Sequence, residues 1–214
     1  MTAARMHLPR IAILTALLLL TLPAAVQAQL TYTTNNGTIT ITGYTGSVGF
    51  LVIPSTINGL PVTTIGDKAF WGRTDLTSVL LRQSVVTIGD QAFAWCTSLN
   101  SVYWFNVTNI GGGAFEECGN LQALPLFTVS SFGPYAFAGC RSLSSVTIGP
   151  VGTISGSAFN SCFSLTSVNI PNTVTNIEYA AFNHCVSLTS VFIPDSVTTV
   201  GNSILFGCAS LSGI

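Results

Sequence analysis

The chain has 214 residues, of which 48% are hydrophobic and only 6% are charged, and its formal net charge is −1. Soluble domains carry about 25% charged residues, so charge is unusually scarce. Disordered chains are poor in apolar residues and rich in charge, which excludes disorder, and the absence of any Lys/Arg cluster excludes a nucleic-acid binder. No run of about 18 apolar residues occurs outside the N-terminus, so the composition does not indicate a polytopic membrane protein.

The first 28 residues have the three parts of a secretory signal. Arg5 and Arg10 form a basic start, residues 11–22 are apolar, and residues 26–28 are the small-residue site that a signal peptidase reads. The apolar stretch is too short for a comfortable membrane span. We therefore expect cleavage after Ala28 and no membrane span in the mature chain; the alternative is an uncleaved signal anchor.

Most of the remaining chain consists of one repeat of 22 or 23 residues, with the pattern AFxxCxxLxxVxI(P)xxVxxIGxx. The Ala-Phe pairs that mark it begin at Ala69, Ala92, Ala114, Ala136, Ala158 and Ala181. The pattern predicts six full units, with boundaries at residues 66–88, 89–110, 111–132, 133–154, 155–177 and 178–200. A partial seventh unit begins at Gly201.

Two periodicities alternate within each unit. The Ala, Phe, Cys and Leu positions share one face of a short helical turn. The V-x-I positions alternate with period two, as in a strand, and V-x-x-I predicts a second short extended segment. One unit cannot bury its own apolar face but stacked units can, so we expect a right-handed repeat solenoid with short parallel β-strands and short helical turns, the rungs lying about 4.8 Å apart.

Residues 29–64 precede the repeats and predict an N-terminal β-hairpin cap. Leu30–Thr34 and Thr38–Tyr44 alternate apolar or aromatic residues with threonine around an Asn-Gly pair, which is a strong hairpin signal. Phe50–Ile53 and Pro61–Ile65 indicate a degenerate first rung without a helical half. The solenoid is expected over residues 65–214. It ends inside a predicted strand without the polar cap that solenoids need, so we expect a fragment or an edge hidden by pairing.

The sequences GDQAFAWCTSLNSV and SAFNSCFSLTSVNIPNTVTNI resemble the BspA-like leucine-rich repeat of bacterial surface antigens. The resemblance extends over about Ile65 to Ile214. It implies a leucine-rich-repeat fold in which cysteine replaces the asparagine ladder of other such repeats, and adhesion to host or environmental proteins. The terminal units depart from the pattern: Arg73 replaces cysteine in the first, and Ile204-Leu205 replaces Ala-Phe in the last.

The six cysteines recur with the repeat and lack the C-x-x-C spacing of a zinc site. They are Cys96, Cys118, Cys140, Cys162, Cys185 and Cys208. The favoured interpretation is a structural ladder of buried free thiols. The alternative is disulfide formation between neighbouring rungs, because an exported protein meets an oxidising environment and the rung spacing suits a disulfide.

No constellation of residues predicts catalysis. His184 precedes Cys185, but adjacent residues on a helical turn point apart and cannot form a nucleophilic pair. Glu116 and Glu117 are the only acidic pair and lie together on the convex face, so they cannot oppose each other across a substrate. The motifs GxSxG, HExxH and GxGxxG do not occur. We therefore expect no enzyme, no catalytic or metal-binding residue and no cofactor.

Outward positions of the predicted V-x-I strands carry a stripe of large side chains. Its members on neighbouring rungs are Leu80, Arg82, Tyr103, Phe105 and Phe127, and Phe192 is a further outward position that could bind a partner. Solenoids bind partners through such strand faces, and exposed aromatic residues with an arginine are typical anchors. The alternative is that the aromatic side chains fill gaps left where the shorter units have lost a residue.

These observations predict a secreted or cell-surface leucine-rich-repeat module that mediates protein–protein or adhesive interactions. Its partner would be a protein or another extracellular macromolecule and not a nucleic acid. The alternative is a structural spacer, the repeat arm of a longer exported protein.

Overall fold

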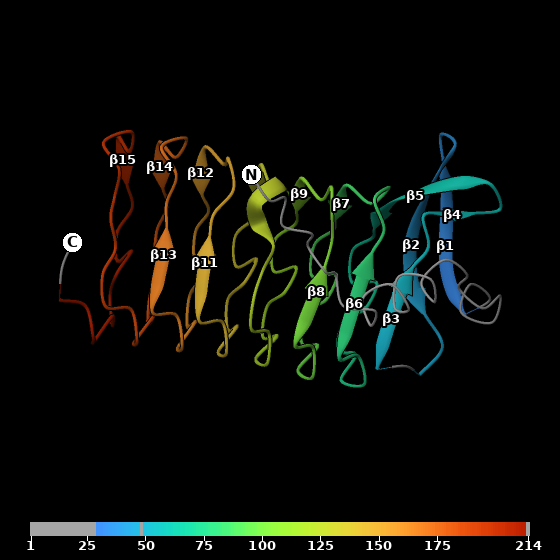
Figure 1. Ribbon diagram of the computed structural model, residues 1–214, viewed down its shortest axis with the longest axis horizontal. Coiled ribbons are helices and arrows are strands. Elements are labelled where there is room, and N and C mark those ends of the chain that lie inside the picture. The colour runs from blue at the N-terminus through green and yellow to red at the C-terminus, as the bar shows by residue number, and fades with distance from the viewer. Residues whose placement is uncertain (1–28, 48, 213–214) are drawn as a thin grey trace, which may run out of the picture.

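The computed structural model describes residues 29–47 and 49–212. The predicted signal, residues 1–28, lies outside the described residues. The described chain is a β-solenoid whose rungs stack along the long axis, with a hairpin at one end and the last repeat at the other (Figure 1). None of its helices is long and apolar enough to cross a membrane.

Two sets of short strands run through the stack. The first set follows the V-x-I positions: β3 (Phe50–Ile53), β6 (Ser78–Leu81), β8 (Ser101–Tyr103), β11 (Ser145–Thr147) and β13 (Ser167–Asn169). The second set follows the V-x-x-I positions: β5 (Leu60–Ile65), β7 (Thr87–Ile88), β9 (Asn109–Ile110), β10 (Ser131–Phe132), β12 (Thr153–Ile154), β14 (Asn176–Ile177) and β15 (Thr199–Val200). Both sets pair in parallel and in register between rungs, for example Val79 with Val102 and Ile88 with Ile110. The predicted parallel ladders are thus present.

Both ladders are interrupted in the middle of the solenoid. The first set breaks between β8 and β11, where a 3₁₀ helix, η1 (Leu126–Thr128), takes the place of a strand, and the second breaks between β10 and β12. Pro125 stands at the strand position of that unit and has no N–H to donate to a ladder.

The N-terminal segment forms the predicted hairpin. Strands β1 (Leu30–Asn35) and β2 (Thr38–Tyr44) are antiparallel, and Asn36 (φ 46°) and Gly37 (φ 78°) are both left-handed, as a type I′ turn requires. Strand β2 then pairs in parallel with β5, so the hairpin continues the second ladder and covers the end of the stack.

A second hairpin was not predicted. Strand β4 (Thr56–Ile57) pairs antiparallel with the start of β5 across Asn58 (φ 51°) and Gly59 (φ 79°). The Asn-Gly signal that identified the first hairpin is also present here.

The prediction of short helical turns is wrong. Within residues 29–47 and 49–212, η1 is the only helix, and each Ala-Phe-x-x-Cys segment is a series of tight turns. Two residues in every rung, one before the alanine and one before the cysteine, are left-handed and interrupt a right-handed helix; in one rung they are Gln91 (φ 53°) and Trp95 (φ 63°).

These turns form a third ladder between rungs. The amide of Gln91 donates to the carbonyl of Gly112 at 2.9 Å and that of Phe93 to Ala114 at 2.8 Å, whereas the intervening amide of Ala92 bonds within its own rung. The left-handed residues rotate alternate peptide planes toward the neighbouring rung. The hydrogen bonds between rungs offset the cost of the left-handed conformation, about 1–2 kcal/mol for each non-glycine residue.

The core is a column of inward side chains. The six repeat phenylalanines are all buried and stack on one another, with neighbouring ring centroids 5.1–6.0 Å apart. They are Phe70, Phe93, Phe115, Phe137, Phe159 and Phe182. Burying each ring stabilises the fold by about 1.5–3 kcal/mol. Burial of this kind supports a chain whose described part contains just two salt bridges, Arg73–Asp75 and Arg141–Glu117.

Candidate interaction surface

Four members of the predicted stripe lie together around β6 and β8. Leu80 is in register with Tyr103 on the next strand, and Phe105 follows Tyr103 two residues later on the same outward side. Arg82 is half-buried and, with Ser55, Gln83 and Phe105, lines a shallow pocket of about 290 Å³. The sheet therefore presents an apolar surface with a polar pocket at its edge.

The aromatic members of the stripe are exposed. The exposed fractions are 53% for Tyr103, 51% for Phe105 and 64% for Phe127, whereas the inward neighbours Val102 and Trp104 are buried. Rings that filled gaps in the core would be covered by their neighbours, so this exposure argues against the gap-filling interpretation.

Phe192, the further outward candidate, lies apart from the stripe. It is 73% exposed, but Thr147 and Asn169, which pair with each other across β11 and β13, occupy the rungs between it and Phe127. The sequence reasoning also missed Phe50, which is exposed on β3 beside the same surface and shows the same outward alternation as Leu80. We call Leu80, Arg82, Tyr103, Phe105 and Phe127 the strand-face cluster.

All six cysteines are free, and five of them are fully buried. Each thiol donates a hydrogen bond to the phenylalanine carbonyl of the preceding rung, with sulfur–oxygen distances of 3.0–3.4 Å. Burial raises the pKa of Cys96 and Cys185 to about 12 and that of Cys140 well above its usual range. Thiols held in the protonated state are poor nucleophiles and poor metal ligands, so this arrangement suits a structural ladder.

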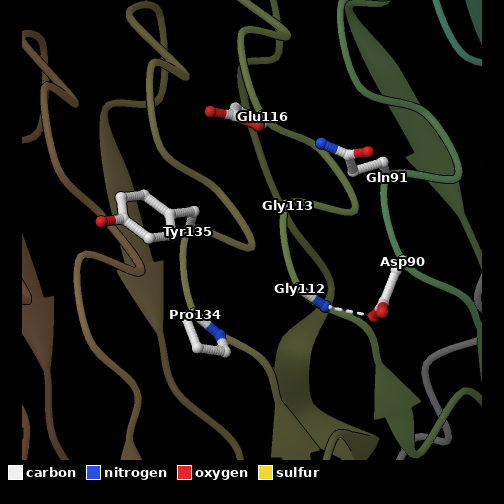
Figure 2. Close-up of a pocket in the computed structure, with 7 residues that line it drawn as sticks. All are labelled: Asp90, Gln91, Gly112, Gly113, Glu116, Pro134 and Tyr135. Atoms are coloured by element: carbon white, nitrogen blue, oxygen red, sulfur yellow. Dashed lines mark hydrogen bonds between the residues drawn. The ribbon is translucent and has the colours of Figure 1, made fainter.

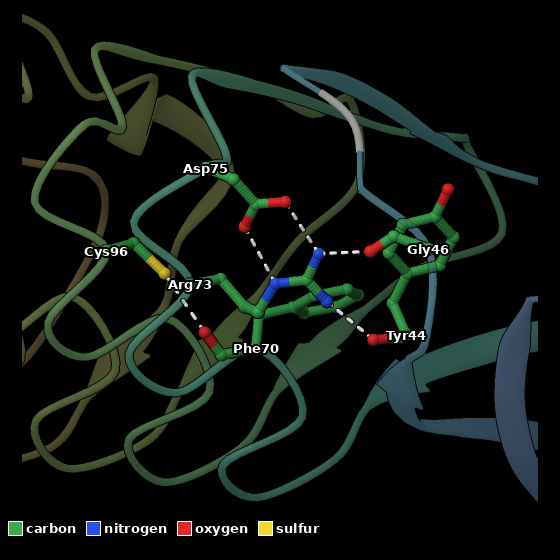
Figure 3. Close-up of polar contacts among 6 residues, drawn as sticks. All are labelled: Tyr44, Gly46, Phe70, Arg73, Asp75 and Cys96. Carbon is green, nitrogen blue, oxygen red and sulfur yellow. Dashed lines mark hydrogen bonds and ion pairs between the residues drawn. The ribbon is translucent and has the colours of Figure 1, made fainter.

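Arg73 occupies the cysteine position of the first repeat and bonds to the N-terminal cap (Figure 3). Its guanidinium donates to the carbonyl oxygens of Tyr44 and Gly46, lies 5.3 Å from the centroid of the Tyr44 ring, and forms a bidentate ion pair with Asp75 at 2.8 Å. The hydrogen bond to Asp75 raises the pKa of Arg73 above its ordinary value. A cysteine side chain is too short for these contacts, which explains the departure from the repeat.

The structure brings no nucleophile and base together at His184. Its ring is exposed, contacts Asn183 and packs edge-on against Phe206, whereas the thiol of Cys185 points to the carbonyl of Phe159 at 3.2 Å. Within residues 29–47 and 49–212, no group of three or more His, Cys, Asp and Glu residues is placed to hold a metal ion.

A slot of about 400 Å³ opens beside β9, and the sequence reasoning did not predict it (Figure 2). Its lining residues are Asp90, Gln91, Gly112, Gly113, Glu116, Pro134 and Tyr135. The run of three glycines at 111–113 is the signal that could have identified it, because that rung lacks the side chains that neighbouring rungs carry there.

A model of the BspA-type leucine-rich repeat region matches residues 63–179 and 152–214, with six copies of the repeat. The chain belongs to the BspA-type leucine-rich repeat family. The crystal structure of a T. pallidum leucine-rich repeat protein has 32% identity and a TM-score of 0.82, and the match covers 89% of this chain and 90% of that one. No curated protein matches significantly.

Two further solved structures of leucine-rich repeat proteins resemble this chain to different degrees. A leucine-rich cell surface protein from Faecalibacterium prausnitzii has 36% identity and a TM-score of 0.81, and the match covers 86% of this chain but 52% of that one. A Bacteroides ovatus leucine-rich repeat protein has 22% identity and a TM-score of 0.58, covering 86% of this chain and 68% of that one, which shows a shared fold. BspA-type chains are repeat scaffolds, and solenoids of this class generally serve as protein-interaction modules.

Proposed function

We propose that this BspA-type chain is an exported binding module that attaches to another protein through the strand-face cluster. The observation that carries the proposal is the exposure of Tyr103 at the end of β8 and of Phe105 two residues later. Large aromatic side chains contribute much of the energy of protein interfaces and lose little conformational entropy when they bind.

Two further observations support export to the cell surface. Residues 1–28 have the pattern of a secretory signal, and the similar Faecalibacterium protein is described as a cell surface protein. Adhesion is then the function that best combines an external location with an exposed aromatic surface.

The proposal is tested by binding of the purified mature protein to a panel of purified extracellular proteins, measured by biolayer interferometry. The double variant Tyr103→Ser/Phe105→Ser is compared with Phe192→Ser, which removes a still more exposed ring from a distant rung. We expect the double variant to lose binding and Phe192→Ser to retain it, with melting temperatures close to that of the parent protein in both.

Two results would count against the proposal. A large drop in the melting temperature of the double variant would mean that the rings stabilise the solenoid. Absence of binding to every panel member would favour the alternative, a structural spacer.

A further inference from the structure

The slot beside β9 exists because one rung lacks two side chains. In each rung, two residues precede the alanine on the same edge of the solenoid, and in the third repeat both are glycine, Gly112 and Gly113. The rungs on either side carry Asp90-Gln91 and Pro134-Tyr135. With rungs about 4.8 Å apart, these two walls stand about 10 Å from each other across a floor of bare backbone.

Hydrogen bonds hold both walls in place. Asp90 Oδ1 accepts a hydrogen bond from the amide of Gly112 at 2.8 Å, which ties the carboxylate to the floor (Figure 2). On the other wall, the hydroxyl of Tyr135 lies 3.2 Å from that of Tyr179, two rungs further on. The slot is therefore preorganised, which lowers the entropic cost of binding.

Glu116 and Gln91 converge over Gly113. A methyl group built on Gly113 would lie 3.2 Å from Glu116 Oε2 and 3.3 Å from the Cγ of Gln91. Glu117 next to it is neutralised by Arg141 at 2.8 Å, whereas Glu116 has no ion pair among residues 29–47 and 49–212. The slot thus places an unneutralised carboxylate and the side chain of Gln91 beside Gly113.

The charge of the lining selects the occupant. Two carboxylates and no lysine or arginine line the slot, so it is negative and attracts a cation. A planar guanidinium, with five N–H donors, matches several carboxylate and amide oxygens better than a compact ammonium does. A neutral sugar would form hydrogen bonds here but would gain nothing from the charge.

We propose that this slot binds an arginine side chain of the partner protein. The inference rests on the proposed function, since it supposes a protein partner, but it concerns a different surface from the strand-face cluster. It adds a criterion for the partner: an exposed arginine that reaches the slot when the aromatic cluster is covered.

The test uses N-acetyl-L-arginine amide as the probe and the mature protein labelled with ¹⁵N. We expect saturable shifts of the Gly112 amide resonance with an affinity of about millimolar, weakened by added salt. N-acetyl-L-glutamine amide, which is neutral and can also form hydrogen bonds, should produce no saturable shift.

Two variants locate the binding. Gly113→Gln fills the slot and should fold, because Gln91 and Tyr135 occupy the same repeat position at φ 53° and 58°, close to 60° for Gly113. We expect Gly113→Gln to weaken binding at least about tenfold and Glu116→Gln to weaken it several-fold, since the latter loses one charge. Ser203→Gln is the matched control, placed at the equivalent position of the last repeat at φ 60°, and should bind as the parent does.

The proposal is wrong if the arginine probe produces no saturable shift, or if the neutral probe produces an equal one. Saturable shifts with methyl β-D-glucopyranoside but not with the arginine probe would also overturn it and would identify a sugar site. The slot test and the strand-face test can be told apart. If the arginine probe binds the slot while Tyr103→Ser/Phe105→Ser leaves partner binding intact, the proposed binding role of the strand-face cluster is wrong, but the proposed arginine site is retained.

Discussion

The thiol of Cys96 donates a hydrogen bond to the carbonyl oxygen of Phe70 on the preceding rung, with 3.1 Å between sulfur and oxygen. The same bond recurs at every later cysteine of the ladder. In the first repeat, where the preceding element is a hairpin, Arg73 replaces the cysteine and bonds to the carbonyls of Tyr44 and Gly46 instead. One side-chain position per repeat thus links each rung to the element before it. A short cysteine bonds to a neighbouring rung, and the longer arginine bonds to the hairpin.

Removing one thiol from the middle of the ladder should destabilise the solenoid. Cys140→Ala leaves the carbonyl of Phe115 without its 3.3 Å contact and creates a small cavity, at a cost of about 1–2 kcal/mol. The midpoint of urea unfolding measures the loss. Cys208→Ala is the matched control; its thiol is half-buried, so we expect a smaller shift, and equal shifts would contradict a role for burial.

The ladder should resist thiol reagents while the protein is folded. Five of the six cysteines are buried and protonated, so 5,5′-dithiobis(2-nitrobenzoic acid) at pH 8 should label at most Cys208 in the native protein and all six cysteines in urea. Fewer than six reactive thiols in the unfolded, unreduced protein would reveal disulfides between rungs.

Folding stability should decrease at alkaline pH. The pKa of Cys96 and Cys185 is about 12 in the folded chain, against an ordinary value of 9.0. Above pH 9 the unfolded chain loses thiol protons that the folded chain retains, so this stabilising contribution is complete below pH 9 and is lost as the pH rises toward 12. Urea midpoints at pH 7, 9 and 10.5 test the trend, and Cys140→Ala should show a shallower decline than the parent.

The Arg73 contacts should hold the N-terminal hairpin on the first rung. Arg73→Cys restores the repeat pattern but removes the bonds to Tyr44, Gly46 and Asp75, and we expect a loss of about 1–3 kcal/mol in the local stability of β1 and β2. Hydrogen exchange of their amides measures it. Arg141→Cys is the control: it removes the exposed ion pair with Glu117 and should change the free energy of exchange of the β1 and β2 amides by less than about 1 kcal/mol.

Trp104 should tolerate a smaller aromatic ring. It is 3% exposed, its Nε1 has no hydrogen-bond partner in the described part of the chain, and its ring stacks on Phe115 at 6.1 Å. Trp104→Phe loses volume but also removes a buried unsatisfied donor, which costs about 1–3 kcal/mol, so the melting temperature should change little. The variant loses the emission of the buried tryptophan and keeps that of the exposed Trp71 and Trp95, so the maximum of tryptophan fluorescence should move to longer wavelength.

Several features could be predicted from the residues alone because they depend on local patterns. The Ala69 and Ala92 spacing revealed the repeat, period-two alternation around Val79 and Val102 located the strands, and Asn36-Gly37 located the first hairpin. The strand-face residues could be named for the same reason, since alternation along a strand decides which side chains face outward.

Other features depend on contacts between rungs. The Ala-Phe-x-x-Cys spacing has helical periodicity, yet Gln91 and Trp95 adopt left-handed conformations that their residue types do not predict. The energetic cost of these left-handed conformations is offset only when carbonyl groups of the neighbouring rung accept hydrogen bonds from alternate amides of the turn. The turn is therefore a property of the stack and not of one repeat.

The sequence by itself determined the period, the buried side of each strand and the N-terminal hairpin, because hydrophobic alternation and Asn-Gly turns act within a few residues. Only the tertiary structure decided that the turns are not helical and that the glycines at 112 and 113 leave a slot. These features arise between residues about 22 positions apart, where rung stacking and the side chains of adjacent repeats set the geometry.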